Sequence, residues 1–176
     1  EDLVLKPAFQ EAVERSVLDL AGETKDGNPG LLIGAPWRID GVLHNAAIML
    51  EDGEISAVRL KHQLPNYGVF DEKRVFQSGP LPGPISFRGI RLGVMICEDM
   101  WFPEVAECLD ESGAELFVVL NGSPFESDKR DERLNFAVAR VNEAGLPLVY
   151  VNLVGGQDEL VFDGGSFVLG ADCSLR

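Results

Sequence analysis

The strongest constraint on the fold is the alternation of apolar runs with helix signals in the second half of the chain. An apolar run at 92–96 ends at Cys97, and Pro103 suits the first turn of a helix that reaches about Ser112. The alternation continues with a buried strand at 116–120, a helix from Ser127 or Asp128 to about Ala144, and strands at 146–153, 160–162 and 166–169. Strands that alternate with helices in this way predict an α/β layered sandwich.

The first half of the chain is richer in strand and turn signals. Helical spacing covers 9–21, and apolar runs predict strands at 31–34, 45–50 and 55–60, the last two joined by a turn at 51–54. This hairpin would place Lys61 at the end of its second strand. A Pro/Gly-rich stretch at 78–84 precedes a second hairpin, with strands at 85–88 and 91–96 and a turn at Gly89. Neither a repeat nor a linker divides the 176 residues, so we expect one domain, 1–176.

Composition excludes some classes of partner. The net charge of −14 argues against nucleic acid and anionic membranes, because both bind basic surfaces. Three irregularly spaced cysteines do not suggest a disulfide framework or a zinc site, so we expect a cytoplasmic protein. We expect neither a membrane span nor a signal peptide. Because the chain opens on Glu1 and stops just after a strand signal, we expect it to be a piece of a longer polypeptide.

Cys97 is the first candidate for chemistry. A thiol at the tip of a buried strand, just before a helix, is a good position for a nucleophile. Its acidic neighbours Glu98 and Asp99 disfavour the thiolate, so a reactive sulfur here needs a cation and a base nearby. The alternative is a small buried hydrophobe, which we assign to Cys108 and Cys173. The turn lacks the flanking glycines of an α/β-hydrolase elbow, which disfavours that class.

Lys61 is the candidate cation. From the residues alone, a solvated surface lysine is favoured. In the functional alternative, the Lys61 ammonium faces Cys97 and stabilises first a thiolate and then an oxyanion. Glu72 lies eleven positions later, beyond a turn, and could reach back to hold Lys61. The competing interpretation of Glu72 is a surface carboxylate paired with Lys73 or Arg74.

Other motifs carry weaker signals. His44 and His62 have no spacing that favours a Cys–His dyad, and no histidines and acids have metal-ligand spacing. The glycine pairs at 155–156 and 164–165 lack the strand and helix of a phosphate loop, so we predict turns there. Ser123 follows the strand at 116–120 directly, where it would hydrogen-bond a substrate or belong to a plain strand-to-helix loop.

Several of these segments resemble the nitrilase superfamily of carbon–nitrogen hydrolases. The matching stretches are Lys61 with Pro65, and Gly93-Val94-Met95-Ile96-Cys97-Glu98-Asp99 with Pro103-Glu104. A closer resemblance is to the glutamine amidohydrolase domain of bacterial glutamine-dependent NAD synthetases. It is carried by Leu64-Pro65-Asn66-Tyr67-Gly68-Val69-Phe70-Asp71-Glu72, Ile96-Cys97-Glu98-Asp99, Asn121-Gly122-Ser123-Pro124-Phe125 and the opening Glu1-Asp2-Leu3.

The resemblance implies a four-layer α-β-β-α sandwich, here incomplete at both ends, with a Glu–Lys–Cys triad. It implies that Cys97 is the nucleophile, Lys61 the lysine and Glu72 an additional glutamate near that lysine. The glutamine pocket would contain Tyr67, Glu98, Trp101, Ser123 and Lys129. The triad glutamate is expected before residue 1, the ATP-dependent synthetase domain is absent, and Gln63 replaces the histidine that many nitrilases have two positions after the lysine.

The implied activity is hydrolysis of glutamine through a cysteine thioester, supplying ammonia for ATP-dependent synthesis of NAD from deamido-NAD. The resemblance implies no cofactor in this domain, ATP and Mg²⁺ in the synthetase domain, and a homo-oligomer. The alternatives are a stand-alone nitrilase-type amidase and a non-catalytic nitrilase-like scaffold, with a Cys–His hydrolase as a more distant third. Because both Cys97 and Lys61 are present, the sequence argues against the scaffold.

Overall fold

The structure, a computed structural model, describes residues 2–176 and consists of two compact units. The first unit ends at Pro80 and the second runs from Leu81 to Arg176, so the boundary falls inside the Pro/Gly-rich stretch at 78–84. Glu1, which opens the motif Glu1-Asp2-Leu3, lies outside the described residues. Within 2–176, no helix has the length and apolarity that a membrane crossing requires.

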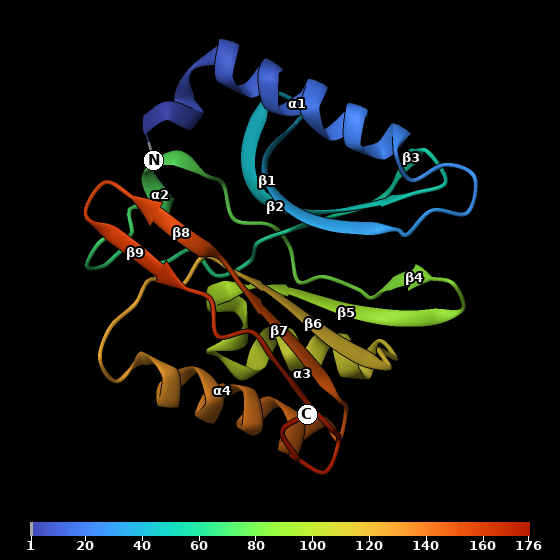
Figure 1. Ribbon diagram of the computed structural model, residues 1–176, viewed down its shortest axis with the longest axis vertical. Helices are drawn as coiled ribbons and strands as arrows, with labels where there is room; N and C mark the ends of the chain where they lie inside the picture. The colour runs from blue at the N-terminus through green and yellow to red at the C-terminus, as the bar shows by residue number, and fades with distance from the viewer. Residues whose placement is uncertain (1) are drawn as a thin grey trace. The chain divides into compact units, whose positions relative to one another are not determined.

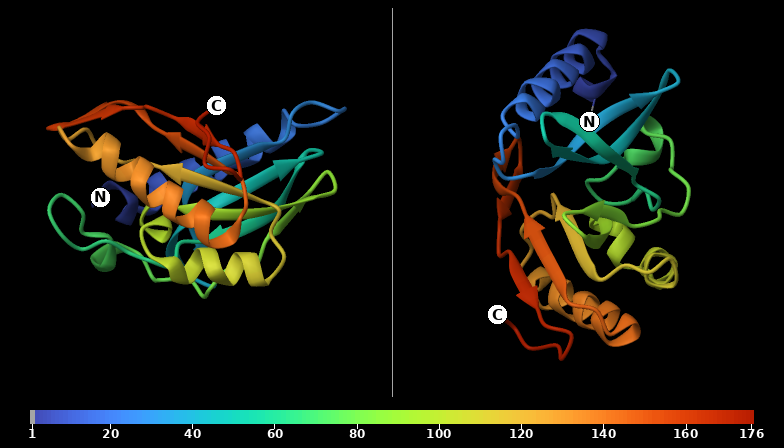
Figure 2. Two further views of the ribbon diagram at one scale, coloured as in Figure 1. Left: turned by 90° about the horizontal axis from the view of Figure 1, so that it is seen from below. Right: turned by 90° about the vertical axis from the view of Figure 1, so that its right-hand side faces the viewer.

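The first unit is a three-stranded antiparallel sheet with one long helix on it. Its elements in chain order are η1 (Asp2–Leu5), α1 (Pro7–Gly22), β1 (Leu31–Ile39), β2 (Val42–Glu51), β3 (Glu54–Leu60) and α2 (Glu72–Val75), with the sheet order β1-β2-β3. Figures 1 and 2 show α1 lying along one face of this sheet. Their shared core contains Val17, Ala21, Ala46, Ile48 and Leu50. The predicted helix and the predicted hairpin at 45–60 are therefore confirmed.

The strand predicted at 31–34 is longer than expected. It continues to Ile39 as β1 and turns back into β2 through Asp40 and Gly41, which both have positive φ angles of 50° and 82°. Two such residues form the tight turn that suits a two-residue hairpin. Pro36 lies within β1, where proline removes one ladder donor, and it is tolerated because β1 is an edge strand.

The second unit is built on a five-stranded mixed sheet with the order β10-β7-β6-β5-β4. Strands β5, β6 and β7 are parallel, and β4 and β10 flank them in antiparallel pairing. The sheet and its helices in chain order are β4 (Ile85–Phe87), β5 (Ile90–Ile96), η2 (Cys97–Met100), α3 (Pro103–Glu111), β6 (Leu116–Asn121), α4 (Lys129–Ala144), β7 (Leu148–Asn152) and β10 (Phe167–Leu169). The alternating strands and helices predicted here are confirmed, and the chain has a mixed α/β fold.

Helices α3 and α4 cover the same face of this sheet (Figure 1). Val105 and Leu109 of α3 and Ala137 of α4 pack into one core with Phe117 and Val119 of β6. The loops that follow the parallel strands β5, β6 and β7 begin at the carboxyl ends of these strands, which is where ligands bind in open α/β sheets.

A two-stranded ribbon lies between β7 and β10 in the chain. It consists of β8 (Val154–Gln157) and β9 (Leu160–Asp163), which pair in antiparallel fashion. The prediction of a turn at Gly155 and Gly156 is therefore wrong, because these glycines are central residues of β8. Gly164 and Gly165, with φ angles of 67° and 68°, lie in the short connection between β9 and β10.

Candidate active site

Lys61 and Glu72 form a buried ion pair in the first unit. The Lys61 Nζ atom lies 2.7 Å from Glu72 Oε1, and the lysine side chain is only 1% exposed. Asn45 donates through Nδ2 to the other carboxylate oxygen at 3.3 Å. The surface interpretation of Lys61 is therefore wrong, as is the pairing of Glu72 with Lys73 or Arg74, whereas the expectation that Glu72 holds Lys61 is confirmed.

The backbone around Lys61 explains why its side chain is fixed. Its N–H donates to the Asn45 carbonyl and its carbonyl accepts from the Gly79 N–H, both at 2.8 Å. A Cβ at Gly79 would come 2.4 Å from the Leu60 Cβ, so this close approach needs glycine. Lys61 is thus held on both sides just beyond β3, and its ammonium is a fixed positive charge in a desolvated place, where charge acts strongly on a neighbouring anion.

The remaining candidates of the first unit are less buried or bind backbone. Tyr67, in the expected glutamine pocket, is 52% exposed and packs edge-on against Phe70, with 6.0 Å between ring centroids. The Nδ1 atoms of His44 and His62 lie 2.7 and 2.8 Å from the carbonyl oxygens of Gln77 and Gly79. Both histidines therefore have a backbone carbonyl as a partner.

Cys97 occupies a strained position at the end of β5. Its φ is +48°, in the left-handed region that few residues other than glycine adopt, and η2 begins at this residue. Asp99 turns its buried carboxylate back to accept the Ile96 N–H at 3.0 Å, and Arg140 donates to the Met100 carbonyl at 3.3 Å. The strand end and the following turn are therefore fixed on both sides of a half-buried thiol.

The flanking acids of Cys97 are themselves part of the packed turn. Glu98 and Asp99 are 8% and 2% exposed, so neither is a solvated surface carboxylate. Because Asp99 is committed to the Ile96 N–H, the carboxylate that the sequence places near the sulfur serves to shape the turn. Glu98, assigned to the glutamine pocket by resemblance, lies in the same buried η2 segment.

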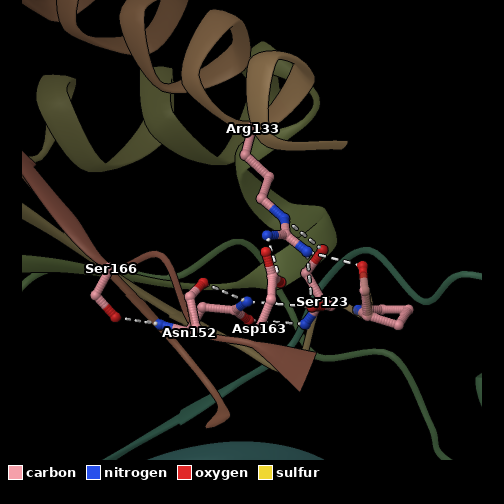
Figure 3. A network of polar contacts seen from close by, with 7 residues as sticks. Ser123, Arg133, Asn152, Asp163 and Ser166 are labelled. Atoms are coloured by element: carbon pink, nitrogen blue, oxygen red, sulfur yellow. Dashed lines mark hydrogen bonds and ion pairs between the residues drawn. The ribbon is translucent and has the colours of Figure 1, made fainter. Parts of the chain in front are cut away.

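Ser123 is held by a buried arginine, as Figure 3 shows. Arg133, on α4, donates through Nε to Ser123 Oγ at 3.0 Å and through Nη2 to the carbonyls of Ser123 and Pro124 at 2.9 and 2.7 Å. Its Nη1 donates to Asp163 Oδ1 at 3.0 Å. Ser123 is 3% exposed, and the predicted strand-to-helix loop is fixed by these hydrogen bonds.

Asn152 fixes the same loop from the end of β7. Its Oδ1 accepts the Ser123 N–H at 2.9 Å, and its Nδ2 donates to the carbonyls of Ser123 and Gly164 at 3.1 and 2.8 Å (Figure 3). Neither Arg133 nor Asn152 was predicted from the sequence. The one available signal was that Arg133 lies four positions before Ala137, on the face of α4 that the apolar residues occupy.

Trp101 and Lys129 lie together in the second unit. The Lys129 Nζ is 4.4 Å from the centroid of the Trp101 ring, a cation–π distance, and 3.3 Å from the Glu132 carboxylate. The other ring neighbour of Trp101 is Phe136, at 4.5 Å between centroids. Two residues that the resemblance assigns to one pocket are therefore neighbours in space.

Tyr150 is a further residue that the sequence did not single out. Its ring is 1% exposed and stacks on Phe167 at 4.7 Å. Burial raises the pKa of Tyr150 above its usual range, the charge of Cys97 raises it further, and Arg133 and the Ser123 hydroxyl act in the opposite direction. Tyr150 therefore belongs to the same electrostatic neighbourhood as Cys97 and Ser123.

The structure thus brings the predicted residues together within each unit. Lys61 and Glu72 are paired in the first, and the second contains Cys97 and Glu98 in one turn and Trp101 beside Lys129. That Cys97 and Lys61 share a cavity stays a prediction.

Comparison with known proteins gives a family and its close relatives. Residues 6–175 match the family model described as carbon-nitrogen hydrolase. The chain is 47% identical over 175 residues to the glutamine-dependent NAD(+) synthetase of Rhodobacter capsulatus, covering 99% of this chain and 32% of that protein. It therefore spans about a third of the length of that relative.

Two solved structures show the same fold. The glutamine-dependent NAD+ synthetase from Acinetobacter baumannii in complex with ADP matches with a TM-score of 0.91 and 36% identity, covering 99% of this chain and 33% of that one. A mutant amidase from Nesterenkonia sp. AN1, showing Michael addition of acrylamide at its active site cysteine, matches with a TM-score of 0.77 and 31% identity. That match covers 94% of this chain and 65% of the amidase.

Proposed function

This chain belongs to the carbon-nitrogen hydrolase family, and on that premise we propose that it is a glutamine amidohydrolase domain with Cys97 as its nucleophile. The observation that carries the proposal is the strained, left-handed backbone of Cys97 at the tip of a parallel strand. Such strain persists where the surrounding structure enforces it, and it concentrates at functional sites. The homology to NAD synthetases supplies the substrate class.

The proposed reaction proceeds through a thioester. A general base takes the thiol proton of Cys97, and the sulfur forms a bond to the side-chain amide carbon of glutamine. The carbon–nitrogen bond then breaks, and ammonia leaves with a proton returned by the base. Water, activated by the same base, hydrolyses the thioester to glutamate and regenerates the thiol. By resemblance, the base is a glutamate that precedes residue 1 in the complete protein.

In this proposal the tetrahedral intermediate carries an oxyanion that two donors stabilise. One is the Lys61 ammonium, held by Glu72, and the other is the backbone N–H of Glu98 at the start of η2. Preorganised donors of this kind supply several kcal/mol of transition-state stabilisation, about 2.7–4 kcal/mol for one oxyanion donor. The residues assigned to glutamine binding are Tyr67, Glu98, Trp101, Ser123 and Lys129.

The wider proposal concerns the complete protein. There the released ammonia would serve ATP-dependent synthesis of NAD from deamido-NAD, with ATP and Mg²⁺ bound by a synthetase domain. The ADP in the Acinetobacter baumannii structure supports a nucleotide site in such proteins. The four-layer α-β-β-α sandwich, the homo-oligomer and the cytoplasmic location also belong to this proposal.

The test is glutamine hydrolysis by the complete protein with Cys97→Ala, and Cys108→Ala as the matched control. We expect Cys97→Ala to abolish glutamine-dependent ammonia release while NAD synthesis from added ammonium persists. Cys108 is half-buried on α3, and its loss should leave both activities intact. Undiminished glutaminase turnover in Cys97→Ala would refute the proposal.

A second candidate is an amidase that acts on a different amide. The match to the Nesterenkonia sp. AN1 amidase, at 31% identity, supports it. Comparing kcat/KM for glutamine, propionamide and butyramide separates the two candidates. A preference for the short aliphatic amides over glutamine would favour the amidase.

A further inference from the structure

Tyr150 presents a buried phenol with an unusual hydrogen-bonding state. Among residues 2–176, no nitrogen, oxygen or sulfur atom completes a hydrogen bond of ordinary geometry with its hydroxyl, although Tyr150 is 1% exposed and the Ser123 side chain acts on its pKa. Nearly all buried side-chain polar groups in native proteins have a partner, so an exception calls for a reason. Stacking on Phe167 at 4.7 Å, with 5° between the ring planes, fixes the ring and hence the place of the hydroxyl.

The strand register places this phenol in one row with Met95, two residues before the nucleophile. Tyr150 pairs with Val119 of β6, and Val119 pairs with Met95 of β5; all three belong to one buried core. Cys97 follows Met95 by two positions and is the first residue after β5. Cys97 lies just beyond the carboxyl end of this row, and its sulfur is close enough for its charge to act on the phenol.

The charges around the phenol favour its protonated form. Burial and the negative charge of Cys97 raise the pKa of Tyr150, and Asp163 adds to this, while Arg133 and the Ser123 side chain oppose it. A phenol that stays protonated remains a hydrogen-bond donor. The Cys97 sulfur shares its turn with the carboxylates of Glu98 and Asp99. Its negative charge as a thiolate therefore needs a compensating donor or cation.

We propose that the Tyr150 hydroxyl donates a hydrogen bond to the Cys97 sulfur when that sulfur is a thiolate. The donor stabilises and orients the reacting atom from within the second unit. The inference rests on the proposed function, because it takes Cys97 as the nucleophile. It adds a residue from β7 to the groups that prepare the sulfur for attack.

The experiment measures how fast iodoacetamide alkylates Cys97 as a function of pH. The thiolate sulfur attacks the methylene carbon and iodide leaves, so the rate follows the thiolate population. The complete protein is compared with Tyr150→Phe, which keeps the ring and removes only the hydroxyl, and mass spectrometry quantifies the adduct on each cysteine. We expect the midpoint of the pH profile to rise by about one unit, which is about tenfold in rate below the midpoint.

Phe167→Leu and Cys108 serve as controls. Phe167→Leu disturbs the packing of the Tyr150 ring and leaves the hydroxyl in place, so the midpoint should move far less than in Tyr150→Phe. The rate at Cys108, measured in the same samples, should be equal in all three proteins.

The outcomes separate this inference from the proposed function. An unchanged midpoint in Tyr150→Phe, with Cys97 still far more reactive than Cys108, overturns the inference alone. Equal shifts in Tyr150→Phe and Phe167→Leu also overturn it, because packing would then explain the effect. If Cys97 of the unaltered protein reacts no faster than Cys108, the proposed function fails and the inference fails with it.

Discussion

The two units each bury a cation, and the two cations are partnered in opposite ways. Lys61 is 1% exposed and meets a side-chain carboxylate, Glu72, at 2.7 Å. Arg133 is 2% exposed and donates to two backbone carbonyls, the Ser123 hydroxyl and Asp163. The Lys61 ammonium is a compact charge beside an opposite charge, whereas the planar Arg133 guanidinium donates several hydrogen bonds along a loop.

This difference indicates different tasks. Arginine presents five donors in a fixed geometry, and here four contacts tie α4 to the Ser123 loop and to the end of β9. Such a group specifies structure. A lysine ammonium has three donors, of which Glu72 Oε1 takes one, and it acts as a point charge. Such a group suits the stabilisation of a charge that appears and disappears during a reaction.

The largest expected effect is on stability, at Arg133. Arg133→Met should lower the free energy of unfolding by about 3–5 kcal/mol, because it leaves the Asp163 carboxylate and the buried Pro124 carbonyl without the arginine donor and removes one of the two donors to the Ser123 carbonyl. Urea denaturation followed by tryptophan fluorescence measures this. The matched control is Asp163→Asn at a side chain that is 32% exposed, where about 1 kcal/mol or less is expected. Equal losses in the two variants would contradict the view that the backbone acceptors dominate.

The next effect is on activity, at Lys61. Lys61→Met removes the charge while keeping most of the volume, and kcat for glutamine hydrolysis should fall by about 10²–10³-fold. Glu72→Gln retains a hydrogen-bonding partner for the ammonium and should cost less. Steady-state kinetics on folded protein, checked by circular dichroism, gives the comparison. A Lys61→Met protein that folds normally and keeps its kcat would mean that the buried pair serves structure only, like Arg133.

The smallest effect is a pH dependence in the second unit, where Arg133 acts on Tyr150. Because burial raises the folded-state pKa of Tyr150 above the usual value, the unfolded chain loses this proton first as pH rises. The contribution to stability is therefore complete below about pH 10 and lost above it. In Tyr150→Phe this alkaline loss should be smaller than in the unaltered protein. Free energies of unfolding from pH 8 to 11.5 test this, and parallel curves would contradict it.

Much of the fold could be predicted because local signals agreed with the tertiary structure. The turn at Asp52 and Gly53 joins β2 and β3 through two positive φ angles, which an Asp-Gly dipeptide favours. The same dipeptide at Asp40 and Gly41 was missed because Pro36 interrupted the strand signal before it. Strand β8 was missed because its glycines indicate a turn, and only its pairing with β9 makes it a strand.

The candidate site likewise contains residues that local sequence signals predict and residues that they do not. Cys97 could be singled out because a strand end and a helix start bracket it within a few residues. Lys61 appeared to be a surface residue because its burial depends on Asn45, Glu72 and Gly79, which are 11–18 positions away, too far for any local pattern. Arg133 was missed for a similar reason, since its partners on the Ser123 loop and at Asp163 are separated from it by up to 30 positions.

The left-handed backbone at Cys97 limits which nucleophiles this turn can accept. A φ of +48° is tolerable for an unbranched side chain but places a β-branched one in steric conflict. Serine fits this geometry, whereas threonine would require the turn to open. An evolutionary replacement of the Cys97 thiol by a hydroxyl could therefore use serine, a primary alcohol, but not threonine, a secondary alcohol.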